Sequence, residues 1–197
     1  SFAYVNSEVG TIEDVKRITR RVRQYRKECG TNTPFVHLDA AQAPLWLSCR
    51  TDSLGVDLMS LDSGKFYGPK GSGVLIHTQG VPIVPYLRGG GQEAGLRSGT
   101  ENVPLIVGFN AALKEAQRTY DTRAARVQGS RDHLLHRLES EISGVLLNGS
   151  REHRVANNVN ISIEGIEGEY AVVALDVAGI AASTRSACGS VEAGGSY

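Results

Sequence analysis

Cysteine is scarce in this chain of 197 residues, and its three cysteines are widely spaced. Cys29, Cys49 and Cys188 are an odd number, and no pair has the C-x-x-C spacing or the nearby histidine cluster typical of a zinc site. The sequence therefore predicts neither a disulfide framework nor a bound metal.

An excess of charge of one sign is also absent. Lysine and arginine together number 21, aspartate and glutamate together number 21, and the formal net charge is zero. This balance excludes a nucleic-acid or membrane-surface protein whose binding depends on overall charge. Hydrophobic residues make up 41% of the chain and charged residues 21%, which is typical of a folded globular protein rather than a disordered one.

No hydrophobic run is long enough to cross a bilayer. The longest, residues 171–182, is interrupted by Asp176 and is far shorter than the roughly 20 apolar residues that a transmembrane helix needs. The N-terminus lacks the basic segment and the small-residue cleavage site of a signal peptide. We therefore expect a cytoplasmic protein without a membrane segment. Because both ends look cut rather than capped, we also expect a fragment of a longer chain.

Four short apolar segments predict the strands of an α/β fold. They are residues 2–5, 35–39, 56–61 and 73–77, and each has the composition of a buried strand. Because a helix or a long connection separates them, we expect a mainly parallel sheet, whose ligands bind at the carboxyl ends of strands. Asp39, Asp62 and Lys65 fall at such ends and are the first candidate site residues.

Apolar residues recur at helical spacing in two parts of the chain. A first helix is predicted over residues 12–25, with Thr11 and Asp14 as a capping arrangement at its start. A second helical pattern runs over residues 104–142, and we expect Gly129 to bend or split it. A helix of about 40 residues would be about 60 Å long, so it is expected to link two bodies.

The remaining pattern predicts an α+β unit after the long helix. Strands are predicted at residues 158–163 and 181–184, around a helix at residues 169–178. The sequence therefore divides into residues 1–108, which form part of a large domain, and residues 109–197, which form a linking helix and an incomplete smaller domain.

The segment DSGKFYGPKG at residues 62–71 carries the strongest chemical signal. A lysine in a turn of small residues after a buried strand can present an amine for Schiff-base chemistry. Spacing alone does not choose between Lys65 and Lys70, and it equally fits a surface lysine. Asp39 ends the preceding strand, where an acid can pair with a pyridinium nitrogen or simply stabilise a turn.

Several motifs in order resemble those of the class V aminotransferase fold group of pyridoxal-phosphate enzymes, and within it the cysteine desulfurases. They are VNSEVG at 5–10, HLDAAQ at 37–42, KFYGPKG at 65–71, GGGQE at 89–93, RSGT at 97–100, residues 158–169 and SAC at 186–188. The resemblance covers nearly the whole chain. It implies that residues 1–108 are part of the pyridoxal-phosphate-binding large domain of fold type I.

The resemblance also implies roles around the cofactor, pyridoxal 5'-phosphate. Lys65 would form the Schiff base with the cofactor, and Lys70 would belong to the structural turn. Asp39 would pair with the pyridine nitrogen, and Gln42 would lie near the phenolic oxygen. Thr100 would reach the phosphate of the neighbouring subunit's cofactor, which implies a homodimer.

Cys188 would be the nucleophile of the reaction that the resemblance implies. It would take the sulfur of L-cysteine as a persulfide, release alanine, and pass the sulfur to an acceptor protein for iron-sulfur cluster assembly or RNA thiolation. No direct contact with nucleic acid is expected. Cys29 and Cys49 match no motif, so we expect them to be small buried residues.

Three positions depart from the family's pattern. The family has a hydroxyl residue, a small residue and a histidine before the lysine, where this chain has Asp62, Ser63 and Gly64. A carboxylate at residue 62 would repel phosphate by about 1 kcal/mol at 4 Å in water, although Ser63 could supply the hydroxyl if the turn shifts by one residue. Ser7 stands where the family has an asparagine at the phenolic oxygen, and it can still donate one hydrogen bond.

These departures leave other readings open. The resemblance places further cofactor and substrate contacts before Ser1 and after Tyr197, so this chain alone is expected to be inactive. One alternative is a cofactor-deficient homologue that acts as a binding or scaffold protein. Another is a selenocysteine lyase or a different class V enzyme.

Overall fold

The computed structural model describes residues 1–184 of the chain. By their internal contacts these residues form two compact units. The first holds Ser1–Tyr4 and Glu13–Arg123, and the second holds Val5–Ile12 and the residues from Ala124 onward. The domain boundary predicted at residue 108 remains a prediction about the whole protein. Within residues 1–184, no helix is long and apolar enough to span a membrane.

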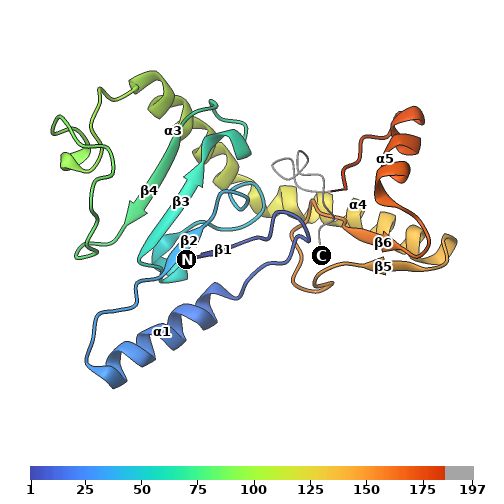
Figure 1. Ribbon diagram of the computed structural model, residues 1–197, viewed down its shortest axis with the longest axis horizontal. Coiled ribbons are helices and arrows are strands. Elements are labelled where there is room, and N and C mark those ends of the chain that lie inside the picture. Colours follow the sequence, from blue (N-terminus) through green and yellow to red (C-terminus); the bar gives the residue numbers. More distant parts are fainter. Residues whose placement is uncertain (185–197) are drawn as a thin grey trace. The chain divides into compact units, whose positions relative to one another are not determined.

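A four-stranded sheet forms the centre of the first unit, in the order β1-β2-β3-β4 (Figure 1). Three strands run parallel, namely β1 (Phe2–Ala3), β2 (His37–Asp39) and β3 (Leu58–Asp62). The fourth strand, β4 (Gly73–His77), pairs antiparallel with β3. The prediction of an α/β fold with a mainly parallel sheet is confirmed.

Helix α1 (Val15–Cys29) connects β1 to β2. It begins after Asp14, whose carboxylate accepts a hydrogen bond from the backbone N–H of Arg17 at 3.0 Å. This bond satisfies one of the free N–H groups of the first turn. Thr11 takes no part in the cap and instead forms an isolated bridge with Arg154. The cap is therefore Asp14 alone.

Alternating burial along β3 shows which of its residues face the core of the first unit. Met59 and Leu61 are buried, whereas the residues on either side of them are half-buried. Leu38 of β2 is also fully buried. The short helix α2 (Thr51–Leu54) adds Leu54 to this core.

The second predicted helix is in fact two helices, α3 (Val103–Arg118) and α4 (Tyr120–Glu141). The break lies at Thr119, so the prediction that Gly129 bends or splits the pattern is wrong. Thr119 has a non-helical φ of −127°, and its hydroxyl donates to the carbonyl of Glu115 at 3.1 Å. Such a bond offers the backbone an alternative to the helical ladder. A glycine within a helix costs only about 1 kcal/mol relative to alanine, so Gly129 does not end it.

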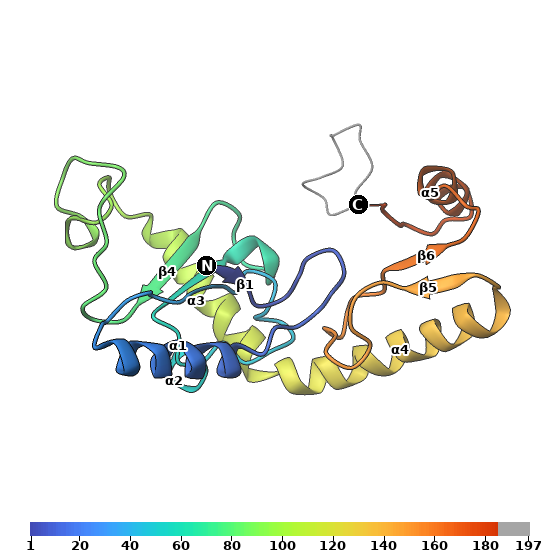
Figure 2. The same ribbon diagram turned by 60° about the horizontal axis from the view of Figure 1, so that its bottom comes forward.

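The second unit contains a two-stranded antiparallel sheet and a helix (Figure 2). They are β5 (Val145–Leu147), β6 (Ile161–Ile163) and α5 (Gly168–Val177). The predictions of a strand near β6 and a helix near α5 are confirmed, whereas β5 was not predicted. The strand expected at residues 181–184 is wrong, because Gly179 turns the chain with a φ of 78° and these residues do not adopt a strand.

Candidate active site

The carboxyl ends of β2 and β3 bring two predicted site residues to one edge of the sheet. Asp39 is the last residue of β2 and lies in register with Ser60 of β3. Lys65 ends the short 3-10 helix η1 (Ser63–Lys65), which directly follows β3. A hydrogen bond of 3.0 Å from the N–H of Ala40 to the carbonyl of Ser60 joins the two strands here. Both Asp39 and Lys65 are exposed at this edge.

The turn that carries Lys65 is anchored on both sides of the exposed amine. Phe66, the next residue, is 1% exposed, and its ring lies edge-on to Phe109 of α3 with 5.2 Å between the ring centroids. The N–H of Gly68 donates to the carbonyl of Ser63 at 3.0 Å, and the N–H of Ser63 donates to the carbonyl of Ser72 at 3.0 Å. A rigid turn thus presents a solvent-accessible lysine.

Helix α3 packs closely against the turn that carries Lys65. A side chain at Gly108 would bring its Cβ to 2.9 Å from the ring of Pro69, and one at Gly68 would bring its Cβ to 3.1 Å from that of Ala112. The contribution of α3 was not predicted from sequence, because these residues are far from Lys65 along the chain. The glycine at position 108 within the helix was the available signal.

Asp62 and Ser63 are already committed to the turn. The carboxylate of Asp62 accepts a hydrogen bond from the N–H of Gly64 at 3.0 Å and so caps η1. The hydroxyl of Ser63 is fully buried and has no hydrogen-bond partner among the described residues. A Cβ added at Gly64 would meet Asp62 Oδ1 at 3.4 Å, an ordinary contact, so the backbone there does not require glycine.

The loops around the sheet orient Asp39 and contain Gln42 and Thr100, the other two predicted residues of the first unit. Asp39 Oδ1 accepts a hydrogen bond from the N–H of Ala41 at 3.0 Å, which fixes the carboxylate at the start of the turn after β2. Gln42 is half-buried in the same turn. Thr100 is exposed, just before Asn102, whose side chain caps α3. The roles of Gln42 and Thr100 remain predictions.

Ser7 belongs to the second unit, and Cys188 lies outside the described residues. Ser7 is exposed in a turn that Asn6 holds, since Asn6 Oδ1 accepts hydrogen bonds from the N–H groups of Glu8 and Val9 at 2.9 and 3.0 Å. The structure thus gathers Asp39, Asp62, Ser63 and Lys65 in one unit. The roles of Ser7 and Cys188 remain predictions.

The other two cysteines differ from each other. Burial raises the pKa of the Cys49 thiol to about 12, which keeps it neutral and unreactive at physiological pH. Cys29, in contrast, is exposed at the end of α1, so the expectation that it is buried is wrong. Cys29 is the last residue of α1, far along the helix from its buried residues Val15 and Thr19.

A shallow pocket of about 280 Å³ lies in the second unit. It is lined by Asp132, Leu135, His136 and Glu139 of α4 and by Arg151. None of the predicted site residues lines it, so the predicted chemistry belongs to the strand edge of the first unit and not to this pocket.

Comparison with known proteins agrees with the geometry of the strand edge. The model of the aminotransferase class-V family matches residues 1–193. The chain belongs to the class-V aminotransferase family. Two curated relatives are the cysteine desulfurase IscS of Dictyoglomus turgidum, 39% identical over 190 residues, and IscS 1 of Archaeoglobus fulgidus, 40% identical over 190 residues. Each match covers 96% of this chain, and 46% and 47% of the respective relatives.

Solved structures similar to this class-V chain include a NifS-like protein and DndA from Streptomyces lividans. The first has a TM-score of 0.83 and 38% sequence identity, and the match covers 93% of this chain and 48% of the other. The second has a TM-score of 0.74 and 32% identity, with coverage of 89% and 48%. The chain thus spans about half the length of the relatives it matches.

Pyridoxal phosphate is the cofactor of the class-V family, and the residues at the strand edge fit one half of it. The Lys65 amine suits its aldehyde, and the Asp39 carboxylate suits its pyridinium nitrogen. The phosphate fits less well, because Asp62 brings a carboxylate to the turn and the Ser63 hydroxyl is buried beneath it. The described residues therefore fit the ring of the cofactor, but residues 62–64 do not fit its phosphate.

Proposed function

We propose that the whole protein is a pyridoxal-phosphate-dependent cysteine desulfurase. The observation that carries the proposal is the exposed Lys65 amine and Asp39 carboxylate at the ends of adjacent parallel strands. Support comes from desulfurase relatives that are 39% and 40% identical to this chain along 96% of its length. The substrate is L-cysteine.

Two side chains of this chain would hold the cofactor. Lys65 Nζ would bond to its aldehyde carbon, and the anchored turn keeps that nitrogen at the sheet edge. The carboxylate of Asp39, oriented by the N–H of Ala41, would keep the proton on the pyridine nitrogen. When bound, pyridoxal phosphate withdraws electrons from the substrate's α-carbon and so weakens the bonds around it.

Sulfur transfer is assigned to Cys188 by its place in the SAC motif. In the proposed reaction the Cβ–S bond of L-cysteine breaks and an S–S bond forms with the Cys188 thiolate. The substrate's carbon gains a hydrogen and leaves as alanine, while the transferred sulfur stays on the enzyme as a persulfide. The sulfur is oxidised as the carbon is reduced, so no outside oxidant is required.

The proposal extends to the assembly and the use of the sulfur. We propose a homodimer, with Thr100 directed to the neighbouring subunit's cofactor, that acts in the cytoplasm. Its sulfur would pass to an acceptor protein for iron-sulfur clusters or RNA thiolation. The support for the iron-sulfur role is the similarity to proteins named IscS, and the support for the dimer is the RSGT motif at residues 97–100.

An absorbance spectrum of the full-length protein with added pyridoxal phosphate tests the proposal. We expect a Schiff-base band at roughly 400–430 nm that is lost in Lys65→Ala and retained in the matched control Lys70→Ala. With a dithiol reductant present to release the persulfide sulfur, we also expect L-cysteine to yield alanine and sulfide. Cys188→Ser should keep the band but lose the persulfide, which separates cofactor binding from sulfur transfer.

One observation favours a second candidate, a cofactor-deficient homologue that acts as a binding or scaffold protein. The Asp62 carboxylate caps η1 next to Gly64, where the phosphate would need a donor. If the wild-type protein shows no band, this candidate replaces the enzyme. A selenocysteine lyase would show the band but turn over L-selenocysteine equally well in the wild type and in Cys188→Ser.

A further inference from the structure

Helix α1 concentrates positive charge to a degree that the rest of the chain does not. Its 15 residues include seven lysines and arginines and one acidic residue, Glu28, although the whole chain has 21 residues of each sign. The seven are Lys16, Arg17, Arg20, Arg21, Arg23, Arg26 and Lys27. One helix thus carries seven of the 21 cations of a neutral chain.

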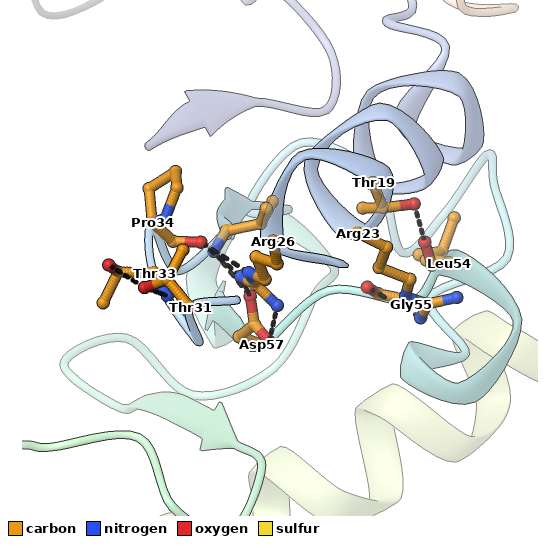
Figure 3. Close-up of polar contacts among 10 residues, drawn as sticks. Thr19, Arg23, Arg26, Thr31, Thr33, Pro34, Leu54, Gly55 and Asp57 are labelled. Atoms are coloured by element: carbon orange, nitrogen blue, oxygen red, sulfur yellow. Dashed lines mark hydrogen bonds and ion pairs between the residues drawn. The ribbon is translucent and has the colours of Figure 1, made fainter. Parts of the chain in front are cut away.

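Two of the seven point inward and serve the fold (Figure 3). Arg26 forms an ion pair of 2.6 Å with Asp57, and Arg23 donates to the carbonyl of Gly55 at 3.1 Å. On the same side, Thr19 donates to the carbonyl of Leu54 at 2.9 Å. These contacts join the inner side of α1 to residues 54–57, at the end of α2 and just after it.

The other five cations form the basic face of α1, defined as Lys16, Arg17, Arg20, Arg21 and Lys27. At 100° per residue they fall on an arc of about 140° on the side opposite the buried Val15. All five are exposed. Within residues 1–184 none of them forms an ion pair, and Arg21 has only a hydrogen bond of 3.1 Å to Gln24.

This arrangement works against the stability of the helix. Lys16 and Arg20, and likewise Arg17 and Arg21, are four residues apart, where like charges repel. Lys16 and Arg17 also lie in the first turn, near the positive end of the helix dipole, and that turn has no acidic residue. A face selected only for solubility would alternate the sign of its charges.

Other helices of the chain do pair their exposed charges. In α3, Arg118 and Glu115 form an ion pair of 2.9 Å, and in α4, Arg137 and Glu141 form one of 2.8 Å. Both pairs have the three- or four-residue spacing that stabilises a helix. The repeated repulsion is therefore a local property of the basic face of α1, and an acidic partner would relieve it.

We propose that the basic face of α1 is a docking surface for an acidic segment of a partner protein. Charge complementarity sets the sign of the partner. The class of partner follows from two further observations. The chain has no net charge to attract nucleic acid over a distance. The carboxylate of Glu28, bonded to Gln24 at 2.7 Å on the same outer side, repels the continuous phosphates of a nucleic acid, whereas the separate carboxylates of an acidic protein segment can bind around it. The proposal does not depend on the desulfurase reaction.

Binding of fluorescently labelled poly-L-glutamate to the full-length protein tests this surface. We expect the double variant Arg17→Glu, Arg21→Glu to bind about tenfold more weakly than the wild type. The matched control is Lys114→Glu, Arg126→Glu, which makes the same change in net charge at exposed positions of α3 and α4. This control should change binding by less than about threefold, because salt screens charges that lie away from the basic face of α1.

The outcomes separate the proposal from its alternatives. Reversing Arg17 and Arg21 keeps the like-charge pairs four residues apart, but it brings a carboxylate at residue 17 within three residues of Arg20 and into the first turn, so the thermal midpoint of the variant should not fall below that of the wild type. Neutralising Lys16→Gln, Arg20→Gln should weaken binding by an intermediate factor. Equal weakening by the α1 variant and the control would overturn the proposal. Tighter binding of an RNA duplex with the same number of charges would overturn the choice of a protein partner.

Discussion

At the scale of single residues, the buried hydroxyl of Ser63 is the least satisfied group near the site. It has no hydrogen-bond partner in the described part of the chain, and an unpaired buried hydroxyl lowers stability. We expect Ser63→Ala to raise the free energy of unfolding by about 1 kcal/mol, measured by urea denaturation of the full-length protein. A lower stability would show that the hydroxyl has a partner in the whole protein.

Two glycines of the same turn should respond in opposite directions to alanine. At Gly64 a Cβ meets only ordinary contacts, so Gly64→Ala should stabilise by about 0.4–1 kcal/mol by restricting the unfolded chain. At Gly68 a Cβ would lie 2.1 Å from Ser63 Oγ, so Gly68→Ala should destabilise by about 1–3 kcal/mol.

A double-mutant cycle checks the cause of the Gly68 effect. In the Ser63→Ala background the contact with Oγ is gone, so the loss from Gly68→Ala should shrink by about 1 kcal/mol. Strict additivity of the two changes would contradict this account. The remaining loss reports the contacts with Cβ of Ala112 at 3.1 Å and with the backbone oxygen of Ser63 at 3.2 Å.

Sequence reasoning found residues that follow apolar strands but not those that support them. Asp39 and Lys65 could be predicted, because the carboxyl ends of parallel strands share an edge. Phe109 could not, since its contact with Phe66 depends on how α3 packs and not on any local pattern. The burial of Ser63 could not be predicted either, because a serine in a turn of small residues is expected to be exposed.

At the scale of elements, Asp57 ties the end of α1 to the strands. Burial alone would raise the pKa of this carboxyl, but hydrogen bonds from Arg26 and from the N–H of Val36, with the charges of Arg26 and Arg23, together hold the pKa below its ordinary value. The carboxylate therefore contributes stability above the unfolded pKa of about 3.9. That contribution is lost as the pH falls through the lower, folded value.

Asp57→Asn tests this link between α1 and the sheet. We expect the variant to lose about 1–3 kcal/mol at pH 7, because the half-buried Arg26 loses its partner. The stability difference between variant and wild type should narrow below about pH 4. Urea denaturation from pH 3 to pH 7 measures both, and a difference that stays constant across this range would contradict the assignment.

Element types were more predictable than element ends. The periodicity of α1 and of the α3–α4 segment was clear, but the break at Thr119 depends on a side chain that competes for one carbonyl. The three-residue strand β5 is too short for any periodicity to reveal it. The apolar composition after α5 predicted a strand at residues 181–184. A strand also needs a neighbouring strand to pair with, and local sequence does not specify one.

At the scale of the whole molecule, alkaline stability should depend on two weak acids of the first unit, the buried Tyr4 and the half-buried Cys49. Burial raises the pKa of Tyr4 and that of Cys49 to about 12, and for Tyr4 the charges of Cys49 and Tyr120 add to the effect. In the unfolded chain these groups ionise at about 10 and 8.5. The unfolded state therefore loses protons that the folded state retains, so stability falls between about pH 9 and pH 12.

Cys49→Ala separates the cysteine part of this effect. We expect the free energy of unfolding of the variant to decline less steeply above about pH 9 than that of the wild type. Alkylation with iodoacetamide at pH 8 gives an independent check, because Cys29 should react while Cys49 stays protected until the protein unfolds. Equal labelling of the two cysteines in the folded protein would contradict the pKa of Cys49.

The antiparallel pairing of β3 and β4 has a consequence for how the first unit folds. These strands are joined only by residues 63–72, whereas β1 and β2 are separated along the chain by α1. Closing a short loop loses less chain entropy than closing a long one, so the β3–β4 hairpin has an advantage in forming early. The loop it closes is the turn that carries Lys65. The turn that carries the Lys65 amine therefore forms with the most local strand pair of the sheet. The pairing of β2 with β3, which brings Asp39 to the same edge, forms more slowly because it joins parallel strands.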